Sequence, residues 1–150
     1  MPALKISGTM TNIPLILASS SRYRRELLDR LGLAYTCVSP EVDETPLAGE
    51  SPVQLCTRLA RLKAEAVAKT NPHAVVIGSD QVCDLDGQAL GKPHTFEKAV
   101  AQLMSMQGKR VVFHTAVCVL SPVLPPQETI SDTVITMRAL TEETVRDYVE

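Results

Sequence analysis

Alternation between apolar and polar blocks divides the chain into short elements. Strands are expected where short apolar or alternating runs are bounded by turn residues, at residues 13–18, 34–39, 74–78, 109–120 and 128–137. The run at 74–78 is the most apolar, and Ser79, Asp80 and Gln81 follow its end. The two long runs flank a Pro-rich loop and suit antiparallel strands. Between them and the apolar run, Asp84 to Gly87 predicts a hairpin turn.

Helices are expected where apolar residues recur at a spacing of three or four, at residues 22–32, 51–70, 95–108 and 141–150. Ser51 and Gln54 can form a capping box around Pro52, and Thr141 can cap the last helix. In the first helix, Tyr23, Leu27, Leu28 and Leu31 share one face. The element order predicts an α/β fold with a mixed twisted sheet flanked by helices.

Length and composition favour one domain of a soluble protein. The chain has 150 residues, of which residues 1–12 are expected to form a loose arm and 13–150 the domain. Met10 is an alternative start, because the patterned elements begin after it. A formal net charge of -2 argues against a protein that grips nucleic acid by bulk positive charge.

The lack of targeting and membrane-spanning patterns and the cysteine usage indicate the cytoplasm. No run approaches the roughly 20 apolar residues that span a bilayer, and the start lacks a signal-peptide pattern. We therefore expect no membrane partner. The cysteines are widely spaced among apolar residues and away from the histidines, which predicts buried reduced thiols and no cysteine–histidine metal cluster; they are Cys37, Cys56, Cys83 and Cys118.

The turn at residues 18–25 joins the first strand to the first helix. Its serines and arginines would lie near the positive end of a helix dipole, where backbone N–H groups and guanidinium groups can bind phosphate. The Gly-Lys-Ser/Thr ending of a Walker loop is missing. Helix-capping serines and solvent-facing arginines remain the alternative interpretation.

Acidic residues stand at two places where a metal or water could be held. Glu41, Asp43 and Glu44 lie in a loop after a strand, and Asp80 follows the most apolar strand. Carboxylate oxygens suit a hard divalent cation, and an Asp near a strand end can ligate metal or orient water. A solvated loop and a turn-capping Asp are the alternatives.

Two lysines complete the set of candidate groups. Lys63 lies in a helix beside core positions, so it need not point outward, and Lys92 is fixed in a loop by Gly91 and Pro93. Either can neutralise phosphate charge, although each alone is an ordinary surface lysine. A basic turn, an acidic loop and a strand-end Asp together are what metal-assisted phosphoryl chemistry requires.

Five ordered segments resemble one known family. The Maf family of nucleotide pyrophosphatases has similar segments in this order and at this spacing, namely LILASSSRYRRELL, EVDET, RLARLKAEAVA, IGSDQV and GKP. The resemblance covers residues 13–150 and implies a fold like that of inosine triphosphatase. It also implies hydrolysis of a nucleoside triphosphate to the monophosphate and diphosphate, with Mg²⁺ or Mn²⁺ as the metal.

The resemblance implies a role for each matching residue. Asp80 would be the catalytic carboxylate, as base or metal ligand, and Glu44 would help to bind metal. The triphosphate would be held by Ser19, Arg24, Lys63 and Lys92. Tyr23 and Gln81 stand where the branch acting on dTTP and UTP has Arg and Thr, so the chain is similar to the 7-methyl-GTP pyrophosphatase branch.

The chemistry of Tyr23 and Gln81 is compatible with a 7-methylguanine base. N7 methylation puts positive charge on guanine, which favours the aromatic face of Tyr23, and the Gln81 amide can bond a purine edge. A core position for Tyr23 is the alternative. Activity on dTTP, UTP or other noncanonical nucleotides, and a non-catalytic nucleotide-binding regulator of cell division, also remain open.

The C-terminal end departs from the family. Family members continue beyond the position of Glu150, so the resemblance implies that a segment that packs on the sheet is absent. The sequence is compatible with a homodimer and does not decide the oligomeric state.

Overall fold

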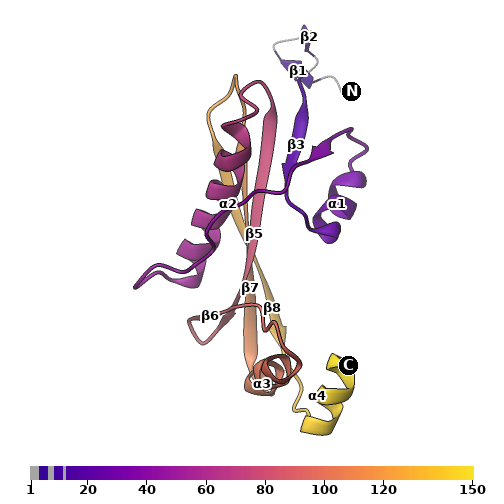
Figure 1. Cartoon of the computed structure of the whole chain (residues 1–150), viewed down its shortest axis with the longest axis vertical. Coiled ribbons are helices and arrows are strands. Elements are labelled where there is room, and N and C mark those ends of the chain that lie inside the picture. The colour runs from indigo at the N-terminus through magenta and orange to yellow at the C-terminus, as the bar shows by residue number, and fades with distance from the viewer. Residues whose placement is uncertain (1–3, 7–8, 12) are drawn as a thin grey trace. The chain divides into compact units, whose positions relative to one another are not determined.

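The computed structural model describes residues 4–6, 9–11 and 13–150 (Figure 1). Its strands are β1 Leu4–Ile6, β2 Thr9–Thr11, β3 Leu15–Ala18, β4 Thr36–Cys37, β5 Val75–Leu85, β6 Gln88–Leu90, β7 Arg110–Leu120 and β8 Gln127–Thr136. Its helices are α1 Arg22–Asp29, α2 Pro52–Ala68, α3 Phe96–Met106 and α4 Glu142–Val149. A six-stranded sheet has the order β4-β3-β5-β7-β8, with β6 paired to β5, which confirms the predicted mixed sheet with helices.

The chain forms two compact units, and several elements contribute residues to both. Unit 1 comprises Met1–Pro46, Thr57–Asp80 and Ala116–Ile130. Unit 2 comprises Leu47–Cys56, Gln81–Thr115 and Ser131–Glu150.

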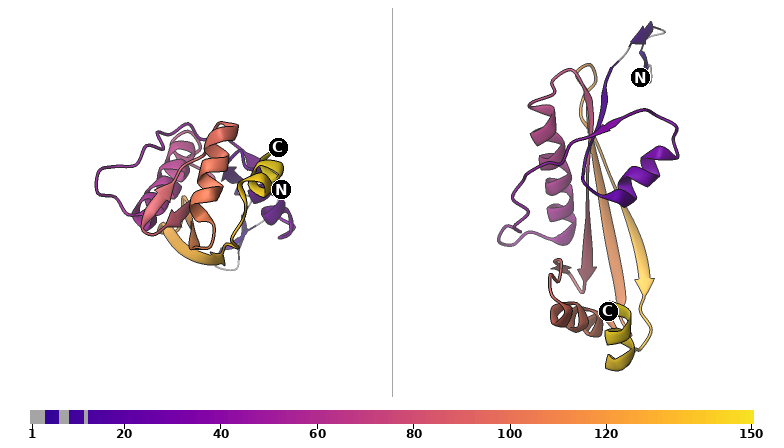
Figure 2. Two further views of the ribbon diagram at one scale, coloured as in Figure 1. Left: turned by 90° about the horizontal axis from the view of Figure 1, so that it is seen from below. Right: turned by 45° about the vertical axis from the view of Figure 1, so that its right-hand side comes forward.

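In unit 1, β3 lies between two parallel partners. Ile16 is paired with Thr36 of β4 and with Val76 of β5. All four residues of β3 are buried, as expected for a parallel strand covered on both faces. Figures 1 and 2 show α2 lying along β5. Apolar residues of this part of α2 are buried, namely Leu59, Ala60, Ala64 and Val67.

In unit 2, β5 turns tightly into β6. Asp86 and Gly87 take φ values of 52° and 86°, the positive values that a two-residue hairpin turn requires. A second core forms around Leu85, Met106 and Val111, so this unit has its own apolar centre. Helices α3 and α4 lie side by side (Figures 1 and 2), and Arg146 ties them by donating two hydrogen bonds to Glu97.

Most predicted elements are confirmed, with one important difference in β5. The strand does not end at Gly78 but continues to Leu85, so Ser79, Asp80 and Gln81 lie inside it. Polar residues can occupy a strand interior when neighbouring elements supply partners. The expectation that Asp80 lies beyond a strand end is therefore wrong.

Smaller differences concern exposure and the N-terminal arm. Of the apolar face predicted for α1, only Leu28 is buried, while Tyr23, Leu27 and Leu31 are exposed. Cys37 is exposed, contrary to expectation, whereas Cys56 and Cys118 are buried.

Within residues 1–12, β1 and β2 form an antiparallel pair that the sequence pattern did not predict. Residues 1–3, 7–8 and 12 of this predicted arm lie outside the described residues. None of the described helices has the length and apolar character needed to cross a membrane.

Candidate active site

The junction between β3 and α1 is organised around Ser19. This serine is buried, and its Oγ accepts hydrogen bonds from the Ser21 N–H at 3.0 Å and from Arg24 Nη1 at 3.4 Å. Ser21 caps α1 by accepting from the Arg24 N–H. Ser19 and Arg24 are thus fixed against each other, while Ser21 has the helix-capping role that the sequence left open.

Asp80 lies next to Lys63 within the same unit. Lys63 Nζ is 2.8 Å from Asp80 Oδ1 and 3.0 Å from Glu44 Oε1. The Lys63 and Asp80 side chains are only 12% and 8% exposed, whereas Glu44 is 54% exposed. One ammonium group therefore joins a strand carboxylate and a loop carboxylate, and the interpretation of Lys63 as a solvent-facing lysine is wrong.

Gly78 explains how the helix comes close enough to the strand. Gly78 and Asp80 are two residues apart on β5 and so face the same side, toward α2. A Cβ at Gly78 would meet the Ala60 carbonyl oxygen and lie 2.6 Å from the Ala64 backbone nitrogen. Only glycine admits this approach, which brings Lys63 to Asp80.

Burial governs the protonation of Asp80. Loss of solvent raises the pKa of its carboxyl above the usual value, and the hydrogen bond and charge of Lys63 oppose this shift without cancelling it. The charge of Arg24 also opposes the rise of this pKa, whereas the charge of Glu44 adds to it. Asp80 is therefore a stronger base than an exposed aspartate, which favours a role in proton transfer.

The carboxylates suit a metal that arrives with phosphate. Glu44 and Asp80 converge on one cation, Lys63 Nζ, so their oxygens approach a common point. Mg²⁺ typically binds through one or two carboxylates together with substrate phosphates. In the described part of the chain, no group of three or more His, Cys, Asp or Glu side chains is arranged to hold a metal by itself. The donor set thus fits a metal–nucleotide complex.

Tyr23 is on α1, one residue before Arg24. Its side chain is 66% exposed, so it is not part of the core. An exposed aromatic face beside the junction of β3 and α1 is available to a ligand. The alternative that placed Tyr23 in the core is excluded, although base recognition itself remains a prediction.

Gln81 and Lys92 belong to unit 2. Gln81 Nε2 donates a hydrogen bond to Thr115 Oγ1 at 3.2 Å, which orients the amide. No sequence pattern predicts Thr115 as a partner of Gln81. Lys92 is exposed in the loop after β6, which Gln102 holds by donating to the Gly91 carbonyl at 2.6 Å. The roles expected for Gln81 and Lys92 stay predictions.

In unit 2, a buried histidine lies between two carboxylates, an arrangement that the sequence pattern did not predict. His114 Nε2 lies 2.8 Å from Asp84 Oδ2, and Nδ1 lies 2.6 Å from Asp132 Oδ1. Burial by itself would lower the pKa of His114, but the two carboxylates outweigh it and raise the pKa. The only sequence signal was the alternation of apolar and polar residues along β5, β7 and β8. This alternation does not reveal which residues of different strands become neighbours.

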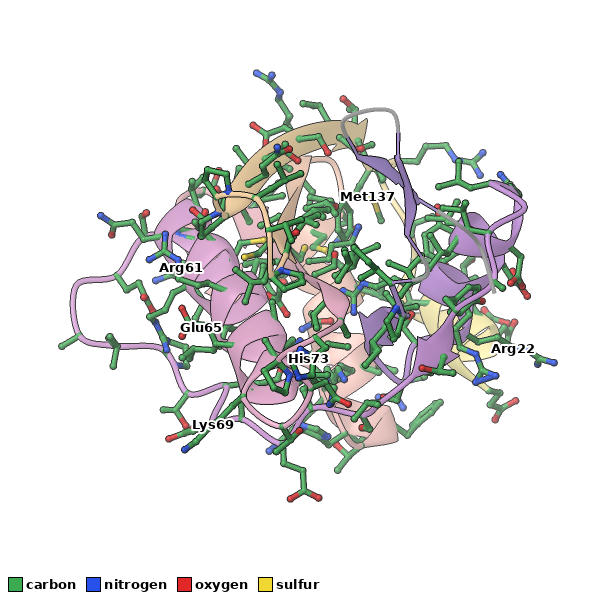
Figure 3. All side chains as sticks on the ribbon, turned by 90° about the horizontal axis from the view of Figure 1, so that it is seen from above. Arg22, Arg61, Glu65, Lys69, His73 and Met137 are labelled. Atoms are coloured by element: carbon green, nitrogen blue, oxygen red, sulfur yellow. The ribbon has the colours of Figure 1, made fainter. Side chains whose placement is uncertain are left out.

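A pocket of about 370 Å³ lies in unit 1, apart from these residues. It is lined by Arg61, Glu65, Cys118, Leu120, Pro126 and Glu128. Figure 3 labels Arg61 and Glu65 on α2, and the Arg61 guanidinium already binds both oxygens of Glu128. None of the predicted site residues lines this pocket.

Comparison with known proteins adds relatives and structural neighbours. A "7-methyl-GTP pyrophosphatase" of Polaromonas sp. is 53% identical over 141 residues, covering 93% of this chain and 64% of that protein. One of Burkholderia orbicola is 62% identical over 107 residues, covering 69% of this chain and 51% of that protein. The chain therefore spans about half to two thirds of the length of these relatives.

Solved structures agree on the fold. The Ham1 protein of Staphylococcus aureus aligns with a TM-score of 0.57 and 18% identity, covering 82% of this chain and 71% of that chain. A HAM1 protein from Coxiella burnetii gives 0.51 and 15%, with the same coverage. The sequence profile of the Maf-like proteins matches residues 14–150, so this chain belongs to the Maf-like family.

Proposed function

We propose that this protein hydrolyses a nucleoside triphosphate to the monophosphate and diphosphate, with 7-methyl-GTP as its substrate. The main support is the Lys63–Asp80 ion pair. In this pair, a buried carboxylate with a raised pKa lies beside an ammonium group, which is a cation that can bind phosphate. The names of relatives at 53% and 62% identity support the nucleotide.

In this proposal the chain's cations hold the triphosphate. Ser19, Arg24 and Lys63 donate to phosphate oxygens, and Lys92 adds charge from its loop. Water adds to the α-phosphorus while the anhydride bond between the α- and β-phosphates breaks, and diphosphate leaves. Asp80 accepts the proton of that water or, as the alternative role, helps to hold the metal.

Mg²⁺ or Mn²⁺ is the proposed metal, held by Glu44 and Asp80 with the phosphates. When bound, it would stabilise the charge that develops on the phosphate oxygens. The convergence of both carboxylates on one ammonium group supports these two residues as its ligands.

Tyr23 and Gln81 are proposed to select the base. A cationic 7-methylguanine is attracted to the electron-rich face of an aromatic ring. If Gln81 Nε2 keeps its hydrogen bond to Thr115, Oε1 of the same amide can accept a hydrogen bond from the N1–H or N2–H group of guanine.

A nucleotide panel tests the proposal. Diphosphate release is measured from 7-methyl-GTP, GTP, dTTP and UTP with Mg²⁺ or Mn²⁺. We expect 7-methyl-GTP to have the highest kcat/KM. A preference for dTTP or UTP would transfer the assignment to that branch, and binding without release would favour the regulatory alternative.

The proposed compartment is the cytoplasm, where free nucleotides are substrates. Association into a homodimer stays a prediction from the sequence, and sedimentation equilibrium measures it. Neither point enters the chemistry above.

A further inference from the structure

Lys63 takes part in two ion pairs at once. Its ammonium group lies within 3.0 Å of Glu44 Oε1 and 2.8 Å of Asp80 Oδ1. These are the same two carboxylates to which the proposed function assigns the divalent metal. A lysine cation and a metal cation would therefore compete for the same oxygens.

Competition is strong because Lys63 is largely buried. A metal ion between Glu44 and Asp80 would be close to Nζ, and two cations at short range repel each other. To make room, Lys63 would have to give up its carboxylate partners. A buried ammonium group without a partner is costly, so bare metal gains little by displacing it.

A triphosphate removes this cost. Its phosphate oxygens offer Lys63 new charge-assisted hydrogen bonds at the moment when the carboxylates pass to the metal. The Arg24 charge, which also acts on Asp80, disfavours a bare divalent cation in the same way and is likewise met by phosphate.

We propose that Lys63 is a placeholder for the metal: it pairs with Glu44 and Asp80 until a metal–nucleotide complex arrives, and thereby disfavours binding of the free metal. This inference rests on the proposed metal role of Glu44 and Asp80. It adds that metal and nucleotide enter together, and that Lys63 exchanges carboxylate oxygens for phosphate oxygens.

The test measures Mn²⁺ affinity without nucleotide, by electron paramagnetic resonance of the unbound ion. Lys63→Met removes the ammonium group and keeps an unbranched side chain. We expect Lys63→Met to bind Mn²⁺ about tenfold more tightly than the unmodified protein, or better. Equal affinity in the two proteins would overturn the proposal.

Lys69→Met is the matched control. Lys69 is exposed one residue after the end of α2, and Figure 3 labels it. Its loss changes net charge equally but should leave Mn²⁺ affinity unchanged. If Lys69→Met tightened binding as much as Lys63→Met, general charge would be the cause and the placeholder role would be wrong.

Further variants secure the result against misfolding and against another site. Lys63→Gln replaces Lys63→Met if the latter does not fold, as judged by circular dichroism, and Lys63→Arg should retain weak binding. Adding Asp80→Asn to Lys63→Met should abolish the gain, whereas a surviving gain would locate the ion elsewhere and refute the proposal. Because no nucleotide is present, failure of the proposed hydrolysis would appear separately, in the nucleotide panel.

Discussion

Lys63 and Asp80 are 17 residues apart in the chain, yet the Lys63 ammonium lies 2.8 Å from a carboxylate oxygen of Asp80. A helix and a strand must approach closely to allow this contact, and Gly78 provides the space. In the proposed function, this pair combines a buried base with a cation that can bind phosphate.

Replacing Asp80 with Asn should remove catalysis while keeping the side-chain shape. An amide cannot accept a proton from water and is a poor metal ligand, so diphosphate release should fall by about 10²-fold or more. The matched control is Asp86→Asn in the hairpin turn, where Asn tolerates the positive φ of 52°. Unchanged turnover in Asp80→Asn would remove this residue from the catalytic role.

Replacing Gly78 with Ala should push α2 away from β5. The new methyl group would meet backbone atoms of Ala60 and Ala64, which cannot turn aside, so the free energy of unfolding should fall by about 1–3 kcal/mol. Turnover should fall as well, because Lys63 moves from Asp80.

Urea denaturation measures the stability of this variant against Gly91→Ala. A Cβ at Gly91 meets no atom within 4 Å, and its φ is not positive, so stability should be unchanged there. Equal stability of the two variants would show that α2 does not constrain Gly78.

Replacing Tyr23 with Ala should reduce selectivity for the methylated base. The loss of a cation–π contact of about 0.5–2 kcal/mol corresponds to a fall of about twofold to thirtyfold in the kcat/KM ratio of 7-methyl-GTP to GTP. Because Tyr23 is exposed, stability should change little. Tyr148→Ala serves as the control, since Tyr148 is 81% exposed on α4. An unchanged ratio in Tyr23→Ala would dismiss the base contact.

The His114 cluster should make stability fall as pH rises. Its pKa is raised in the folded protein, above the ordinary value of 6.5, because Asp84 and Asp132 outweigh the effect of burial. The stabilisation is therefore complete below pH 6.5 and is lost as pH rises through the folded-state pKa. Because one proton is involved, the free energy of unfolding can fall by at most about 1.4 kcal/mol per pH unit above pH 6.5.

Urea denaturation at about pH 6 and about pH 8 measures this loss, below the range where the neighbouring Cys83 thiol titrates. Burial raises the pKa of that thiol, so it stays protonated at both values. His114→Asn cannot titrate and should show a much smaller difference between the two conditions. A difference as large as in the unmodified protein would assign the pH effect to another group.

Local chemistry in the sequence determined much of the fold. Apolar period and capping residues located α2, α3 and α4 to within a few residues, because Ser51, Thr95 and Thr141 satisfy backbone N–H groups at helix starts. The end of β5 was not predictable in this way. Ser79 and Asp80 look like loop residues until Ala116 and Lys63 supply their partners.

The sequence by itself determined the element types, the candidate residues and, through five ordered segments, the family. Tertiary structure alone decided which charges meet. It paired Lys63 with Asp80 and Glu44, buried His114 between Asp84 and Asp132, and exposed Tyr23. The physical reason is that periodicity reports which face of an element is apolar. It carries no information on which distant element covers that face, and electrostatic partners are set by that covering.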